Sequence, residues 1–133
     1  MKFSNIKPIS IDAALLILRL SFGVLLAYNH GLDKLESFIK DSSDFYNFMG
    51  LGPSVSFALA VFAELVCALF LSVGLFTRYA LIPLIITFAV AVFSVHSGDA
   101  LADKEHALLY LTAFVALFFS GPGRYSVDAK IIK

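Results

Sequence analysis

The chain has 133 residues, equal numbers of acidic and basic side chains and one cysteine, and 59% of its residues are hydrophobic against 15% that are charged. Soluble globular proteins have roughly 45–50% apolar and about 25% charged residues, so this composition and a mean hydropathy of +0.88 indicate a membrane protein. The zero net charge leaves no basic surface for nucleic acid, and a single cysteine excludes an internal disulfide and any CxxC site for redox chemistry or zinc.

Four apolar segments, in chain order, predict four membrane-spanning helices. A spanning helix needs about 20 mainly apolar residues. The first predicted helix covers about residues 11–33 and includes Arg19; because an arginine does not suit the apolar region of a signal peptide, we expect this helix to be retained. Glu64 interrupts the second segment, whereas the third and fourth have no charge in their interiors. The other three helices are expected at about residues 54–76, 78–97 and 104–121.

Basic residues outside these helices predict the orientation of the chain, since lysine and arginine concentrate in cytoplasmic loops. One end of the predicted bundle carries Lys2, Lys7, Arg78, Arg124, Lys130 and Lys133, and the other carries Lys34, Lys40 and Lys104. We therefore expect both termini in the cytoplasm, as an even number of helices requires, and a single domain over residues 1–133. The connection at 35–54 is too apolar for a solvated loop, and we expect an interfacial segment at the headgroup level there.

Two charged residues lie inside the predicted spans, Arg19 near the middle of the first and Glu64 near the middle of the second. An unpaired charge at the bilayer centre costs about 2.5–3.5 kcal/mol on insertion scales. We therefore predict that the two side chains pair, directly or through water. Such a pair serves either a ligand site or only the packing of two helices, and both interpretations stay open.

Further polar residues gather at the outer ends of the predicted helices. His30 follows Arg19 by eleven positions, which places both within roughly 20° on one helix face. The third predicted helix ends with a histidine, and the fourth begins with a carboxylate and another histidine. We expect a vestibule here, although each histidine alone also suits a plain membrane interface, and no spacing matches metal ligands. The candidates for ligand binding or proton relay are Arg19, His30, Lys34, Glu64, His96, Glu105 and His106.

The stretch "LRLSFGVLLAYNHGLDKL" at 18–35 resembles the first-helix signature of the DoxX family, with an arginine, a glycine four residues later and a closing His-Gly before lysine. The stretch "AELVCALFLSVGLFTRYA" at 63–80 resembles its second helix and turn, and "FSVHSGD" and "GPGRYS" resemble its third-helix exit and its tail. The resemblance covers about residues 14–131, but Cys67 and Ala68 stand where many members have a Gly-Gly pair. The positions that match the family pattern are Arg19, His30, Lys34, Glu64, Thr77, Arg78, His96, Glu105 and Arg124.

The resemblance implies a four-helix, multi-pass protein of the bacterial inner membrane. Some relatives are described as membrane subunits of thiosulfate:quinone oxidoreductase or as parts of oxidoreductase complexes tied to thiol stress, and distant relatives act in membrane-protein assembly. The implied partners are the lipid bilayer and a membrane or peripheral oxidoreductase, with a homo-oligomer left open. The cofactor stays open, with a quinone as the candidate that these relatives suggest.

Three functions follow from these residues. The first is a redox-associated membrane subunit that binds a small lipophilic ligand such as a quinone: Arg19 and Lys34 stabilise negative charge on the reduced ligand, and the histidines or Glu64 pass protons. Because no residue of this chain carries electrons reversibly, it is at most a subunit of a quinone-linked oxidoreductase complex. The alternatives are a non-catalytic scaffold or assembly factor and a small-solute transporter.

Overall fold

The computed structural model of the chain describes residues 9–40, 50–95, 98, 100 and 104–131. Every regular element in these residues is a helix, which confirms the all-α prediction for this part of the chain. Short π-helical segments, with hydrogen bonds between residues five apart, interrupt the α-helices. Residues 41–49, the centre of the predicted interfacial segment, lie outside the described residues.

The first helical rod consists of α1 (Ile11–Leu26), the π-helical segment η1 (Ala27–Gly31) and α2 (Leu32–Lys40), which follow one another without a break. Ser10 caps its start, because the Ser10 hydroxyl accepts a hydrogen bond from the Ala13 N–H at 3.1 Å. The rod therefore continues past residue 33, where the first spanning helix was expected to end.

The second rod consists of α3 (Pro53–Val61), η3 (Phe62–Cys67) and α4 (Ala68–Val73). Its first helical residue is a proline, whose missing N–H would have no partner in the first turn anyway. Gly74 ends the rod in the left-handed conformation at φ 77°, and its N–H returns to carbonyls of the last turn. This glycine lets the chain reverse sharply into the next helix.

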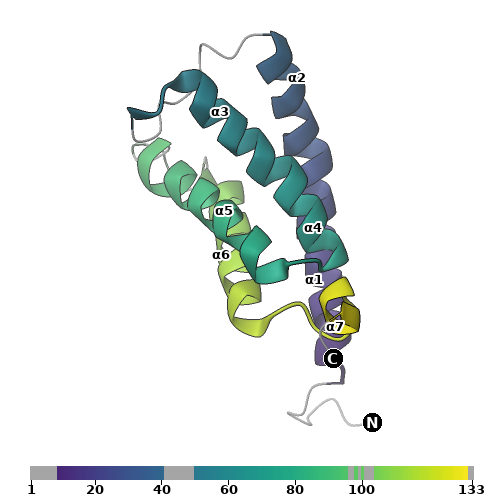
Figure 1. Cartoon of the computed structure of the whole chain (residues 1–133). Helices are drawn as coiled ribbons and strands as arrows, with labels where there is room; N and C mark the ends of the chain where they lie inside the picture. Colours follow the sequence, from purple (N-terminus) through teal and green to yellow (C-terminus); the bar gives the residue numbers. More distant parts are fainter. Residues whose placement is uncertain (1–8, 41–49, 96–97, 99, 101–103, 132–133) are drawn as a thin grey trace.

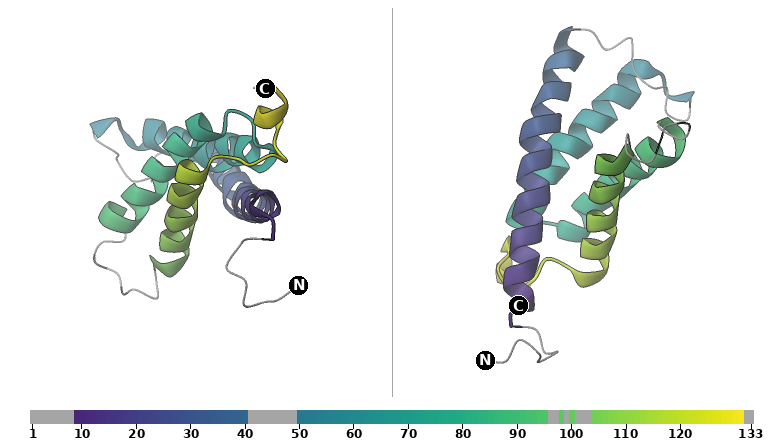
Figure 2. Two further views of the ribbon diagram at one scale, coloured as in Figure 1. Left: turned by 90° about the horizontal axis from the view of Figure 1, so that it is seen from below. Right: turned by 180° about the vertical axis from the view of Figure 1, so that it is seen from behind.

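The remaining helices are α5 (Thr77–Val90), which ends in η4 (Ala91–Val95), α6 (Glu105–Ser120) and the short α7 (Val127–Ile131). The two rods lie side by side and antiparallel, because α1 packs against α4 and α2 against α3, while α5 packs against α6 (Figure 1). The start of α1 and the whole of α7 lie at one end of the bundle, and α2 reaches the other, as both views of Figure 2 show. We call these the α7 end and the α2 end.

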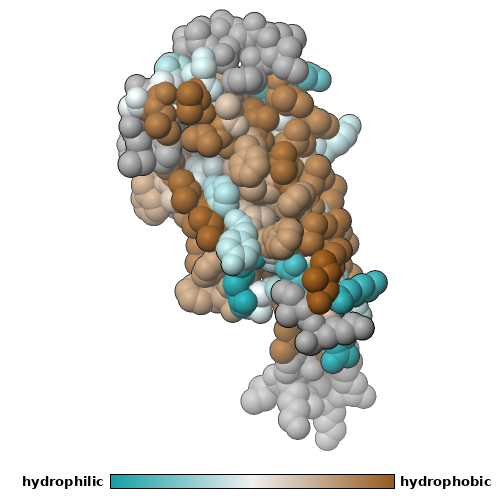
Figure 3. Space-filling view, in the orientation of Figure 1, coloured by the Kyte–Doolittle hydropathy of each residue, from teal (hydrophilic) through white to brown (hydrophobic). Residues whose placement is uncertain are grey.

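The bundle places small side chains between its helices and large apolar ones outside. Ala27, Ala63, Ala68 and Ala107 are buried in the core, where small residues let helices approach closely. Exposed large apolar residues occur on α1, α3, α4, α5 and α6, and they give the broad apolar surface of Figure 3. By length and composition, Ile11–Ser37 and Pro53–Val73 are able to cross a membrane, and Thr77–Phe93 and Glu105–Ser120 are shorter apolar helices.

Candidate functional site

The direct pair that we predicted between Arg19 and Glu64 is wrong, because Arg19 binds backbone carbonyls instead. The Arg19 side chain is fully buried, and its Nη1 donates to the Ser72 carbonyl near the end of α4 at 3.0 Å. Ser72 lies eight residues after Glu64, or about 12 Å farther along the helix, so the two charged groups are at different depths. The other two bonds are from Nε to the Pro122 carbonyl at 2.9 Å and from Nη2 to the Tyr125 carbonyl at 2.6 Å.

Arg19 therefore has a structural role at the α7 end. The last carbonyls of a helix lack intrahelical partners, and a cation near that terminus also suits the helix dipole. Arg19 satisfies one such carbonyl of α4 together with two carbonyls of the loop that follows α6. One buried guanidinium thus joins α1, α4 and the loop at 121–126.

Glu64 forms its ion pair with Lys34. Lys34 Nζ lies 2.8 Å from Glu64 Oε2, and the side chains are 32% and 3% exposed respectively. Oε2 is buried, and the Lys34 ammonium at charge-assisted hydrogen-bond distance is its one polar partner within the described residues. A carboxylate oxygen accepts about two hydrogen bonds, so acceptor capacity remains at this buried atom.

The two π-helical segments η1 and η3 pack against each other beside the Lys34–Glu64 ion pair. His30 and Gly31 belong to η1, and Glu64 belongs to η3. The helices touch backbone to backbone, because a Cβ built on Gly31 would lie only 2.5 Å from the Glu64 carbonyl oxygen. π-Helical insertions are rare and are frequent at functional sites. Sequence reasoning missed them, since hydropathy does not reveal an inserted residue.

Gly31→Ala should destabilise the protein by about 1–3 kcal/mol, as overpacking at a rigid contact does. The added methyl group meets backbone rather than a flexible side chain, so η1 and η3 must move apart. Gly98→Ala is the matched control, because nothing lies within 4 Å of its Cβ position and the change should cost little. Unfolding in detergent micelles measures both; equal stabilities would contradict the close contact.

An aromatic cluster continues the site from η1 to α6. The rings of His30 and His106 are nearly parallel, 5.8 Å between centroids, and His30 meets Tyr110 edge-on at 5.9 Å. Tyr110 also contacts Phe22 at 5.5 Å and Phe88 at 5.2 Å. Sequence reasoning missed Tyr110, although it lies one helical turn after His106 and hence on the same face.

We define the polar–aromatic site as Lys34, Glu64, His30, His106 and Tyr110, with Phe22 and Phe88 as apolar neighbours. His30 and Tyr110 both lie within electrostatic reach of the Glu64 carboxylate, so the charged and aromatic parts form one site. Four helical segments contribute to it, namely η1, α2, η3 and α6. The structure thus brings together four of the predicted candidates: His30, Lys34, Glu64 and His106.

The other predicted candidates lie elsewhere or outside the described part. Arg19 is at the α7 end, and Glu105 is exposed in the first turn of α6, where an acidic residue suits the helix dipole. His96 lies outside the described residues. Within the described part, no group of three or more histidine, cysteine, aspartate or glutamate side chains is arranged to hold a metal ion.

The α7 end is closed by a second set of polar contacts, centred on Asp128. Its carboxylate accepts hydrogen bonds from the N–H groups of Phe76 at 2.8 Å and Thr77 at 2.9 Å, and from the Thr77 hydroxyl at 2.8 Å. Phe76 adopts a left-handed conformation at φ 47°, which is rare for a bulky residue. Asp128 therefore caps the start of α5 from a position 51 residues away in the sequence.

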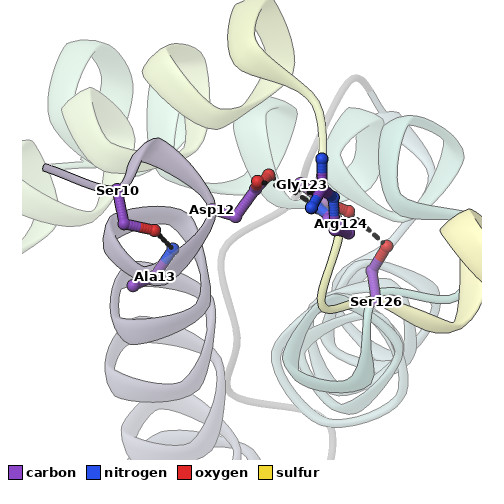
Figure 4. Close-up of polar contacts among 6 residues, drawn as sticks. All are labelled: Ser10, Asp12, Ala13, Gly123, Arg124 and Ser126. Atoms are coloured by element: carbon purple, nitrogen blue, oxygen red, sulfur yellow. Dashed lines mark hydrogen bonds and ion pairs between the residues drawn. The ribbon is translucent and has the colours of Figure 1, made fainter. Parts of the chain in front are cut away.

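A neighbouring contact joins this loop to α1. Asp12 Oδ1 accepts a hydrogen bond from the Arg124 N–H at 2.9 Å, and Asp12 Oδ2 lies 3.8 Å from Arg124 Nε (Figure 4). The Ser126 hydroxyl donates to the Gly123 carbonyl at 2.7 Å, which tightens the same turn. The chain after α6 is thus fixed to α1 and, through Asp128, to α5.

Acid should destabilise this end of the protein. Burial raises the pKa of Asp128, but the hydrogen bonds from Thr77 and Phe76 and the nearby Arg19 charge outweigh burial and hold the pKa below its ordinary value of 3.8. The carboxylate therefore stabilises the folded state fully above that ordinary value, and the stabilisation is lost as the pH falls through the lower folded pKa. Asp128→Asn should remove this acid dependence and cost about 1 kcal/mol at neutral pH, as the loss of a helix cap does. Unfolding in detergent across the acid range measures both, and an unchanged acid dependence in Asp128→Asn would contradict the assignment.

The chain is similar to known proteins over the helices that contribute most residues of the polar–aromatic site. A family model described as DoxX matches residues 14–97, more than half of the chain. An uncharacterized protein of Haemophilus influenzae is 29% identical over 141 residues, which span 100% of this chain and 93% of the relative. No solved structure matches the chain. The matched range includes His30, Lys34 and Glu64, and it ends before α6 begins.

Proposed function

Since this chain belongs to the DoxX family, we propose that it is a multi-pass inner-membrane protein whose polar–aromatic site binds a small, flat lipophilic ligand of the quinone class. In this proposal it is the membrane subunit of a redox complex. The observation that carries the proposal is the buried Glu64 Oε2, whose one polar partner within the described residues is Lys34 and which lies within electrostatic reach of His30 and Tyr110.

The apolar exterior supports the membrane placement. The two rods and the helices α5 and α6 turn large apolar side chains outward. By length and composition, the two rods are able to cross a bilayer. The helix α5 continues through η4 to Val95, and α6 is an apolar helix of 16 residues. The proposed orientation puts the α7 end in the cytoplasm, because the sequence gives six basic residues outside the predicted helices on that side and three, Lys34, Lys40 and Lys104, on the other.

The chemistry of the side chains fits a quinone. A ring oxygen of the oxidised ligand needs hydrogen-bond donors, which Lys34 and Tyr110 supply, and a hydroxyl of the reduced ligand needs an acceptor, which Glu64 supplies. Phe22 and Phe88 offer apolar faces for the ring. The bound quinone would supply reversible two-electron chemistry, and Glu64 and His30 would hold or move the protons that accompany it.

This proposal gives Arg19 no direct part in ligand binding. Three of its nitrogens already donate to carbonyls at the α7 end. The chain also has only one cysteine and hence no dithiol, so electrons would come from a partner oxidoreductase.

A scaffold function is the second candidate. The Lys34–Glu64 pair joins α2 to η3, and Arg19 joins three segments, so both buried charges also serve to hold helices together. A pure scaffold would retain no ligand at the polar–aromatic site. The two functions therefore differ in one measurable property, the ligand content of the purified protein.

The test is the quinone content of protein purified from native membranes in a mild detergent, measured by extraction and mass spectrometry. The proposal predicts about one quinone per folded chain, and a loss of most of it in Glu64→Gln, which removes the negative charge and the ion pair with Lys34, and in Tyr110→Phe, which removes the hydroxyl. Arg124→Gln is the matched control and should keep the ligand, because its side chain is 80% exposed at the other end. Folded wild-type protein without quinone, or equal content in Glu64→Gln, would favour the scaffold.

A further inference from the structure

Cations and aromatic rings gather on the surface of the α7 end. Arg78, Arg124 and Lys130 are exposed, and so are three rings, with Tyr79 77%, Phe119 80% and Phe76 56% exposed. We call these six residues the basic rim. Figure 3 shows hydrophilic side chains at this end of the molecule, directly below the apolar surface.

The acidic groups near the basic rim are already engaged. The Asp128 carboxylate accepts hydrogen bonds from Phe76 and Thr77, and Asp12 accepts one from the Arg124 N–H. The contact from Asp12 to the Arg124 side chain is long, at 3.8 Å, and lies at an exposed guanidinium, where ion pairs are weak. The cations of the rim therefore keep most of their positive potential.

The Arg78 guanidinium is held in a fixed position. Its Nε donates to the Phe118 carbonyl at 3.0 Å, near the end of α6. Gly121 lies beside its terminal nitrogens, and a Cβ there would be 3.1 Å from Nη2, so the missing side chain leaves room next to the guanidinium. The terminal nitrogens of Arg78 donate to no group of the residues that the structure describes, and the planar edge of a guanidinium is well suited to a bidentate contact with phosphate.

We infer that the basic rim binds the headgroup of an anionic phospholipid in the cytoplasmic leaflet. The inference rests on the membrane placement of the proposed function. The positive charge of the basic rim favours an anionic headgroup over a neutral one. Arg78, Arg124 and Lys130 supply positive charge to the headgroup level, and the rings of Tyr79, Phe119 and Phe76 lie at that level, where aromatic residues concentrate. The site is separate from the polar–aromatic site, since the two belong to opposite halves of the bundle.

Native mass spectrometry of the full chain in mixed micelles tests this inference. The micelles contain equal amounts of phosphatidylglycerol and phosphatidylcholine with the same acyl chains. Wild-type protein should retain the anionic lipid about tenfold more often, and Arg124→Gln/Lys130→Gln should lower this preference to about twofold or less, because one cation near the surface is worth up to about fivefold. The double variant leaves the hydrogen bond from Arg78 to the Phe118 carbonyl of α6 intact, so we expect it to fold. The lipid preference of Arg78→Gln, which loses that bond, is measured in a separate sample.

The matched control is Lys104→Gln, which removes a lysine at the start of α6, away from the rim. It should leave the lipid preference unchanged. Equal retention of the two lipids by the wild type, or an equal loss of preference in Lys104→Gln, overturns the inference. Quinone content measured in the same samples separates this result from the proposed function: a failed lipid site leaves quinone bound, and a failed quinone site leaves the lipid preference.

Discussion

Arg19→Leu should lower the free energy of unfolding by at least about 3 kcal/mol, because it removes three charge-assisted hydrogen bonds at once. The three carbonyls, of Ser72, Pro122 and Tyr125, would lose their donor, and the bond to Ser72 is buried, so water does not replace the donor there. We expect the loop after α6 to detach from α1 and α4.

Arg19→Lys should recover only part of this loss, since an ammonium group cannot match the planar arrangement of three guanidinium nitrogens. Arg124→Gln is the control for the loss of a charge at the same end and should change stability by less than about 0.5 kcal/mol, because its side chain is exposed. Unfolding in mixed micelles measures the three variants. An Arg19→Leu protein as stable as Arg124→Gln would show that the three hydrogen bonds do not hold this end together.

Lys34→Met should destabilise the protein by about 2 kcal/mol, because it leaves the buried Glu64 carboxylate without its partner. We place the cost below that of a fully buried pair, since Lys34 is 32% exposed and its charge is partly screened by solvent. The double variant Lys34→Met/Glu64→Leu should recover most of the stability, because apolar residues of similar volume replace a buried ion pair at little cost.

The double-mutant cycle on Lys34 and Glu64 measures this coupling directly. The single variants and the double variant are compared by unfolding in detergent, with Glu36→Gln as a control for an exposed charge on the same helix. A double variant no more stable than the sum of the single changes would mean that the two side chains do not interact, contrary to their 2.8 Å separation.

The helices were predictable from the sequence because each long helix of this chain corresponds to a long apolar run. The buried charges were also recognisable, since Arg19 and Glu64 interrupt such runs. Their partners were not, because pairing depends on the relative depth of two helices. The ion pair with Lys34 and the bonds to Pro122 and Tyr125 both depend on a register and on a folded-back loop, which hydropathy does not encode.

The composition of the site was predictable only in part. His30, Lys34 and His106 were selected for their polarity at the ends of apolar segments. Tyr110 was not predicted, because a tyrosine within an apolar helix is usually interpreted as a core residue. Tyr110 follows His106 by four positions, however, and therefore lies on the same helix face. The π-helical segments were not predictable, since they add a residue to a helical turn without a distinct sequence pattern.

Photo-cross-linking with a radiolabelled azido-quinone tests the central claim most directly, because it locates a ligand in the folded protein rather than inferring it from a variant. The account predicts labelled peptides from η3 around Glu64 and from α6 around Tyr110, with labelling that excess unlabelled quinone abolishes and that Glu64→Gln reduces. Labelling confined to the outward apolar faces of the helices, unaffected by unlabelled quinone, would contradict it.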